Sequence, residues 1–205
     1  MKRNDFFILK TIVVFLILFT TMSVSAQDSS YSDFYRQSLK TNNTGMFVLG
    51  GWAIANIATG GIGWAKNSGS SKYFNQMNLF WNTVNLSIAG FALYSNYQQE
   101  ILELTNEAML QNHLKIENLY LINGGLDIVY IGTGFLLKHL STKNEKRKDL
   151  LYGYGNSVIL QGAFLFVFDL IMWGIQRNHR FEFLNSLEPV FTTAKFTEIG
   201  FKFYF

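Results

Sequence analysis

The sequence contains no cysteine and a single proline, Pro189. The lack of cysteine excludes disulfide bonds, thiolate metal sites, a cysteine nucleophile and a lipid-modified cysteine. Because proline breaks helices, its scarcity leaves long helices almost uninterrupted. Charged residues are also few, at 15% of the chain against roughly 25% in a typical soluble domain, whereas 49% of residues are hydrophobic. Lipid is therefore the expected surroundings of much of the chain.

Residues 1–26 have the pattern of a secretory signal peptide. Lys2 and Arg3 form a basic start, an apolar stretch follows, and Val24-Ser25-Ala26 is a small-residue cleavage site. The alternative is an uncleaved anchor helix, and both interpretations place the next segment outside the cytoplasm. Without this segment the chain has 14 basic and 13 acidic residues, since three of its 17 and one of its 14 are removed. A charge so close to balance indicates no nucleic-acid partner.

Four apolar stretches predict an all-α membrane protein whose transmembrane helices form two tandem helical hairpins. Each stretch approaches the roughly 20 residues needed to cross the hydrocarbon core of a bilayer. Together they make up a transmembrane domain over residues 46–175. The predicted spans are residues 46–64, 77–94, 119–137 and 158–175.

The segments around these spans have other patterns. Residues 27–45 are polar, and we interpret them as a periplasmic tether in preference to a short interfacial helix. Residues 95–118 predict an amphipathic helix above the membrane, because several glutamates share one face at helical spacing. Residues 176–205 predict a β-like periplasmic tail, since phenylalanines alternate with other residues near its end. That ending also resembles a barrel strand, but the rest of the chain lacks the repeated alternation of a barrel.

The charges of the connecting segments predict the orientation. The connections after the first and third spans contain seven Lys/Arg, whereas the connection between them contains one. Cytoplasmic loops of membrane proteins carry an excess of Lys and Arg. Together with the signal peptide, this bias predicts a multi-pass protein of the bacterial inner membrane with both termini in the periplasm.

The first span carries a row of small residues, which predicts close helix packing. Gly51, Ala55, Thr59 and Gly63 recur every four residues and so share one helix face. Such a face lets a second helix approach closely, either within the chain or in a homodimer. Lipid disfavours unwinding at the glycines, because unwinding would leave backbone groups without hydrogen bonds.

Polar residues inside the spans form the candidate site. Asn78, Asn82 and Asn85 share a helix face. A helix rises about 1.5 Å per residue, so one polar residue from each span is expected about 9–15 Å below the outer boundary of the membrane. Two interpretations remain open: a site for a small solute or proton, and a polar clasp that fixes helix register. The candidate polar layer consists of Asn56, Asn82, Asn85, Asp127, Gln161 and Asp169.

The two hairpins also resemble one another, which predicts an internal repeat. Asn56-Ile57 aligns with Asp127-Ile128, and Asn82-Thr83-Val84 aligns with Asn156-Ser157-Val158. Each copy would contain two spans, so both copies would have the same orientation. The axis relating them would then lie along the membrane normal, as in parallel transporter repeats.

No catalytic, cofactor or metal site is predicted. His113, His139 and His179 are expected near or beyond the membrane surfaces and on different sides, and no phosphate-binding loop or HExxH pattern occurs. The glycines of the first span lie inside a helix, where they serve packing. We therefore expect neither an enzyme nor a bound cofactor.

The first hairpin resembles an uncharacterised family of small bacterial membrane proteins with a domain of unknown function. The resemblance covers about residues 45–175 and depends on Gly51-Trp52, Asn56, Gly60, Gly63 and the Met77-Asn78, Trp81-Asn82 and Val84-Asn85 pairs. It implies four helices and supplies no activity. We expect a structural or protein-interaction role in the bilayer, as a homodimer or with another membrane protein. The alternative is a transporter or channel subunit for a small solute or proton.

Overall fold

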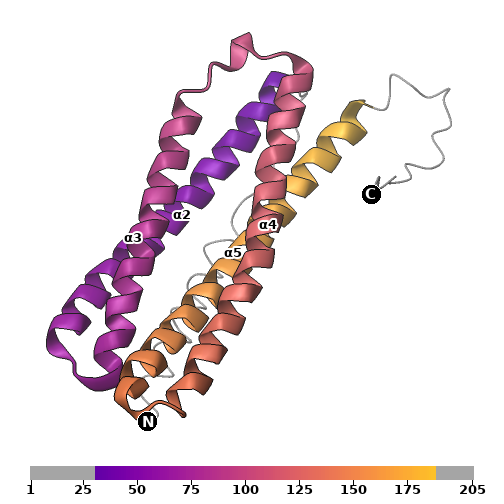
Figure 1. Cartoon of the computed structure of the whole chain (residues 1–205). Helices are drawn as coiled ribbons and strands as arrows, with labels where there is room; N and C mark the ends of the chain where they lie inside the picture. Colours follow the sequence, from indigo (N-terminus) through magenta and orange to yellow (C-terminus); the bar gives the residue numbers. More distant parts are fainter. Residues whose placement is uncertain (1–30, 188–205) are drawn as a thin grey trace, which may run out of the picture.

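The computed structural model describes residues 31–187, which form an elongated bundle of four long helices (Figure 1). Short turns join α2 to α3 and α4 to α5 at one end, and a longer connection joins α3 to α4 at the other. The elements are α2 (Tyr31–Lys66), α3 (Gly69–Tyr97), the 3-10 turn η1 (Ile101–Glu103), α4 (Asn106–Ser141), the 3-10 turn η2 (Glu145–Arg147) and α5 (Lys148–Leu187).

The helices pair as two hairpins, α2 with α3 and α4 with α5, and α3 also packs on α5. Within each hairpin, the two helices approach each other closely at a glycine. A Cβ atom on Gly60 of α2 would lie 2.8 Å from the backbone oxygen of Asn75, and one on Gly134 of α4 would lie 2.8 Å from that of Gly155. This arrangement confirms the predicted all-helical architecture of the described region.

Three of the described helical segments are long and apolar enough to cross a membrane: α2, α4 and Glu145–Leu187. The sequence predicted four spans, and α3 is the one that does not reach this hydropathy. Its 29 residues extend about 43 Å, so length is not the reason. Its asparagines lower its hydropathy, and Asn78, Asn82 and Asn85 are buried against the other helices.

The outside of the bundle is apolar along its middle. Phe91 is 73% exposed and Val129 is 61% exposed, with many other large apolar side chains around them. The buried side chains include about as many polar as apolar ones. Soluble proteins rarely expose such extended apolar surfaces, so this distribution matches a protein surrounded by lipid.

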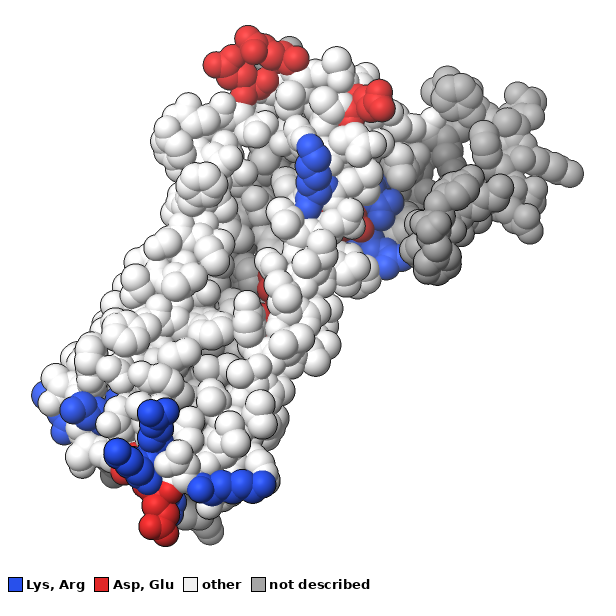
Figure 2. Space-filling model, viewed as in Figure 1, with Lys and Arg blue, Asp and Glu red and all other residues white. Residues whose placement is uncertain are grey.

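Charges gather toward the two ends (Figure 2). We call the end with the Asn67–Ser68 and Thr142–Arg147 segments the basic end, and the end with the connection between α3 and α4 the distal end. The basic end carries lysines that flank the Asn67–Ser68 turn and lysines within Thr142–Arg147, and the distal end carries Glu100 and Glu103. Tyr31 and Leu187, the limits of the described chain, both lie at the distal end.

The structure corrects three predicted boundaries. The polar segment 27–45 is helical from Tyr31 onward, because Phe34, Tyr35 and Leu39 pack against Met109 and Phe183 in a second core. The predicted 95–118 helix is divided: α3 ends at Tyr97, and α4 continues from Asn106 through the third predicted span. The 176–205 tail is helical up to Leu187, and residues 1–30 and 188–205 lie outside the described region.

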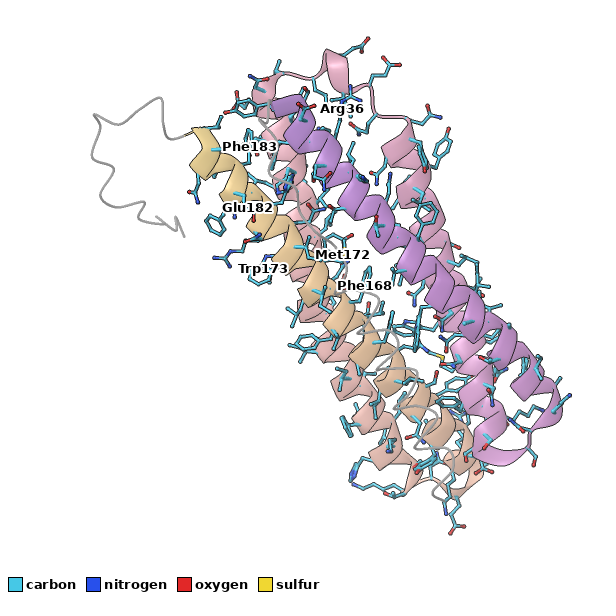
Figure 3. All side chains as sticks on the ribbon, turned by 180° about the vertical axis from the view of Figure 1, so that it is seen from behind. Arg36, Phe168, Met172, Trp173, Glu182 and Phe183 are labelled. Carbon is cyan, nitrogen blue, oxygen red and sulfur yellow. The ribbon has the colours of Figure 1, made fainter. Side chains whose placement is uncertain are left out.

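The main core lies at mid-bundle. Met46 and Leu49 of α2 pack there with Tyr120 of α4 and with Phe168 and Met172 of α5. Figure 3 shows Phe168 and Met172 on neighbouring turns of α5, on the side that faces α2. This core separates the polar groups described next from those at the distal end.

Candidate functional site

An amide network joins α2, α3 and α5. The Asn78 side chain donates to Asn56 Oδ1 over 2.9 Å, and Gln161 Nε2 donates to Asn78 Oδ1 over 2.7 Å and to Asn56 Oδ1 over 3.4 Å. Trp52 Nε1 donates to Gln161 Oε1 over 2.9 Å, and Ser157 Oγ donates to Asn78 Oδ1 over 3.0 Å. We call these five residues the amide clasp.

The clasp is almost closed to solvent. Gln161 and Ser157 have no exposed surface, Asn78 is 4% exposed and Asn56 is 8% exposed. The indole ring of Trp52 stacks on Phe164, with ring centroids 3.9 Å apart. Because its amide groups bind one another, the clasp can hold three helices in register without a ligand.

Asn82 and Asn85 continue the polar face along α3. Asn82 Nδ2 donates to the backbone oxygen of Asn78 over 2.8 Å, and Asn85 Nδ2 reaches Asn82 Oδ1 over 3.5 Å. The helical spacing of these asparagines predicted one shared face, and all three are buried. They connect the clasp to a cavity.

The cavity has a volume of about 420 Å³ and is lined by residues of all four helices. Asn85 contributes from α3, Asn123 and Asp127 from α4, and Asp169 from α5. Asp127 is 2% exposed and Asp169 is 5% exposed. Red acidic atoms are visible at the bottom of a hollow midway along the otherwise uncharged surface (Figure 2).

The two carboxyl groups line the same cavity from α4 and α5, which pack against each other. Asp127 Oδ2 is buried and has no hydrogen-bond partner within residues 31–187. A buried acceptor without a partner is costly, which makes this oxygen a candidate contact for a proton, a water molecule or a ligand.

The predicted polar residues thus separate into two groups. Asn56 and Gln161 belong to the clasp, Asp127 and Asp169 form the wall of the cavity, and Asn82 and Asn85 lie between them. Asp169 is eight residues beyond Gln161 on α5, which is about 12 Å along the helix. The clasp and the two carboxyl groups therefore lie at different levels along the bundle axis, several helical turns apart.

Most of the predicted small-residue face lies on the outside of the bundle. Gly51, Ala55 and Thr59 are exposed on the outside of the bundle, and a Cβ atom on Gly51 would meet nothing within 4 Å. Gly63 lies against the side chain of Asn75, so this residue alone of the four is at a close approach within the chain. A packing role for the other three stays a prediction about contacts between chains.

A further polar cluster at the distal end was not predicted. His113 Nδ1 lies 2.7 Å from Ser38 Oγ, its Nε2 lies 3.1 Å from the backbone oxygen of Gln176, and Arg180 binds Glu117 through two hydrogen bonds. The sequence carries little signal for it, because its members come from three helices. Three of them, Ser38, Gln176 and Arg180, lie in segments that the sequence predicts to be a tether and a tail. Within the described residues no group of three metal-ligating side chains could hold a metal ion.

Comparison with known proteins agrees with the predicted resemblance. No curated protein and no solved structure matches the chain. A family model matches residues 48–170, a range that contains the clasp, every cavity-lining residue except Met46, and the basic loop between α4 and α5. The chain therefore belongs to the family of unknown function DUF6992.

Proposed function

We propose that the protein crosses the bacterial inner membrane four times, with its basic end in the cytoplasm and its distal end in the periplasm. The excess of Lys and Arg at the basic end supports this orientation. The packing of α3 between α2 and α5 supports its inclusion as a fourth span, because α3 is connected to α2 by a two-residue turn. The signal peptide, which lies outside the described residues, is part of the same proposal.

We propose further that the cavity binds a small solute or a proton inside the membrane. The observation that carries this function is Asp127 Oδ2, which is buried without a partner at a cavity shared with Asp169. Charged groups inside a bilayer are expensive and commonly mark ion or solute pathways. The sequence alone favoured a structural role, and the cavity with its unpaired oxygen is the observation that supports the alternative of a site.

Flux measurements in proteoliposomes test this function. The purified chain is reconstituted, and proton entry is followed with an internal pH dye under an imposed potential. We expect wild-type protein to raise proton entry above that of empty vesicles. In the Asp127→Asn, Asp169→Asn double variant this increase should be at least tenfold smaller. The exposed Asp149 supplies the matched control, so Asp149→Asn should retain wild-type flux. Equal flux in wild type and the double variant would contradict the proposal for protons.

The second candidate function is the structural or interaction role. The closed amide clasp supports it, because a mutually bonded network stabilises a bundle without a ligand. The exposed row of Gly51, Ala55 and Thr59 supports association between chains. Cross-linking of Ala55→Cys between two copies in native membranes, with exposed Val129→Cys as the control, tests it. Equal cross-linking at both positions would contradict an interface at this row.

A further inference from the structure

The cavity opens between α3 and α4, the two helices of the bundle that pack least against each other. Each packs on other helices, and between them lies the hollow in which acidic atoms are visible (Figure 2). The rims of the cavity include Val84 and Ile88 of α3, which are more than half exposed on the apolar outside. A molecule dissolved in the bilayer could therefore reach the carboxyl pair sideways, between two helices.

The charge of the lining favours a cation. The cavity wall has two carboxyl groups and, among the described residues, no Lys, Arg or His. A single positive charge would neutralise one of these carboxylates while the other carboxyl group keeps its proton. Asp127 Oδ2 can accept a hydrogen bond from that cation, and nothing else in the described chain supplies one.

The remainder of the lining favours an organic cation over a metal ion. Divalent metals such as Ca²⁺ take about six to eight oxygen ligands, whereas most of this wall is apolar or aromatic. Trp81 and Tyr130 meet edge to face with ring centroids 4.9 Å apart, and Tyr120 and Phe168 line the same cavity. Aromatic faces attract ammonium groups, most strongly where water is excluded.

We propose that the cavity binds a monovalent amphiphilic amine, with its ammonium group at Asp127 and Asp169 and its apolar part against Trp81 and the apolar rim. This inference deepens the proposed solute site and rests on it. The size of the cavity fits a small molecule, because ligand pockets commonly measure about 300–1,000 Å³. Entry from the lipid explains why the charged wall lies at the bottom of an otherwise apolar hollow.

Binding of a matched pair of probes tests the ligand class. The full chain in lipid nanodiscs is titrated by calorimetry with 4-phenylbutylamine and with 4-phenylbutan-1-ol, which differ in the ammonium group, and empty nanodiscs are titrated in parallel to subtract partitioning. We expect the amine to bind at least tenfold more tightly than the alcohol. Equal binding of the two probes would overturn the proposal.

Variants locate the site and separate the two proposals. Asp127→Asn should reduce amine affinity at least tenfold, Trp81→Leu should reduce it several-fold, and Asp149→Asn should leave it unchanged; helix content by circular dichroism checks folding of each. Unchanged amine affinity in folded Asp127→Asn overturns the inference. If the amine does not bind but Asp127→Asn abolishes proton flux, the ligand class fails and the proton site stands. If neither binding nor flux is found, both proposals fail.

Discussion

Replacement of Gln161 by methionine tests the amide clasp directly. Methionine has a similar size and shape, so the change removes polar atoms without opening a large cavity. Gln161 makes three side-chain hydrogen bonds, to Trp52, Asn78 and Asn56. Such bonds between membrane helices are worth about 0.6 kcal/mol each on average, which predicts a loss of about 2 kcal/mol of stability.

Reversible unfolding in mixed micelles measures this loss. The folded fraction is followed by circular dichroism while the proportion of sodium dodecyl sulfate increases. Val167 lies on the same helix and is 51% exposed, so Val167→Met is the matched control and should change stability by less than about 0.5 kcal/mol. If Gln161→Met and the control have equal stability, the clasp does not hold the helices together.

A double-mutant cycle with Asn78 tests whether the hydrogen bonds of the clasp stabilise the bundle jointly or independently. Asn78 Oδ1 accepts from both Gln161 and Ser157, so the side chains act as one unit. We expect Gln161→Met and Asn78→Leu to be non-additive by at least about 0.5 kcal/mol, as is usual for residues in one hydrogen-bond network. Additive losses would show that the two residues act independently.

The remaining predictions concern other parts of the bundle. Gly134→Leu should destabilise the protein by more than about 2 kcal/mol, since a Cβ atom there would lie 2.8 Å from the backbone of α5, whereas Gly132→Leu has open space and should cost less than about 0.5 kcal/mol. Equal costs in unfolding titrations would refute this. Glu117→Gln should cost about 2 kcal/mol, because the bidentate pair with Arg180 loses its charge, and an unaltered thermal midpoint in detergent would contradict it. Gly69→Ala should cost about 1 kcal/mol, because Gly69 has a φ of 57°, and a higher midpoint would argue against strain there.

The sequence predicts which residues share a helix face wherever their spacing matches the helical repeat. Asn78, Asn82 and Asn85 repeat at three and four residues, and this fixes them on one side of a helix whatever the partner is. In a bilayer this side would be turned inward, because amides are costly to expose to hydrocarbon. The burial of all three follows from these two facts.

Helix ends and helix partners were less predictable. The polar residues of 31–45 suggested a tether, but Phe34, Tyr35 and Leu39 find a core on α4 and α5 that lies far away in sequence. Likewise, Gly51 and Gly60 both lie on α2, and the sequence alone does not tell which of them meets α3. The structure places Gly60 at that contact and Gly51 outside.

Composition and periodicity by themselves were enough to predict a helical protein, helices apolar enough to cross a membrane and amides in the interior, because each of these depends on local chain properties and the solvent. Only the tertiary structure decided that Asn56 and Gln161 close a clasp while Asp127 and Asp169 share a cavity. The reason is physical: hydrogen bonds and cavities depend on how helices distant in sequence pack together, which the period of one helix does not specify.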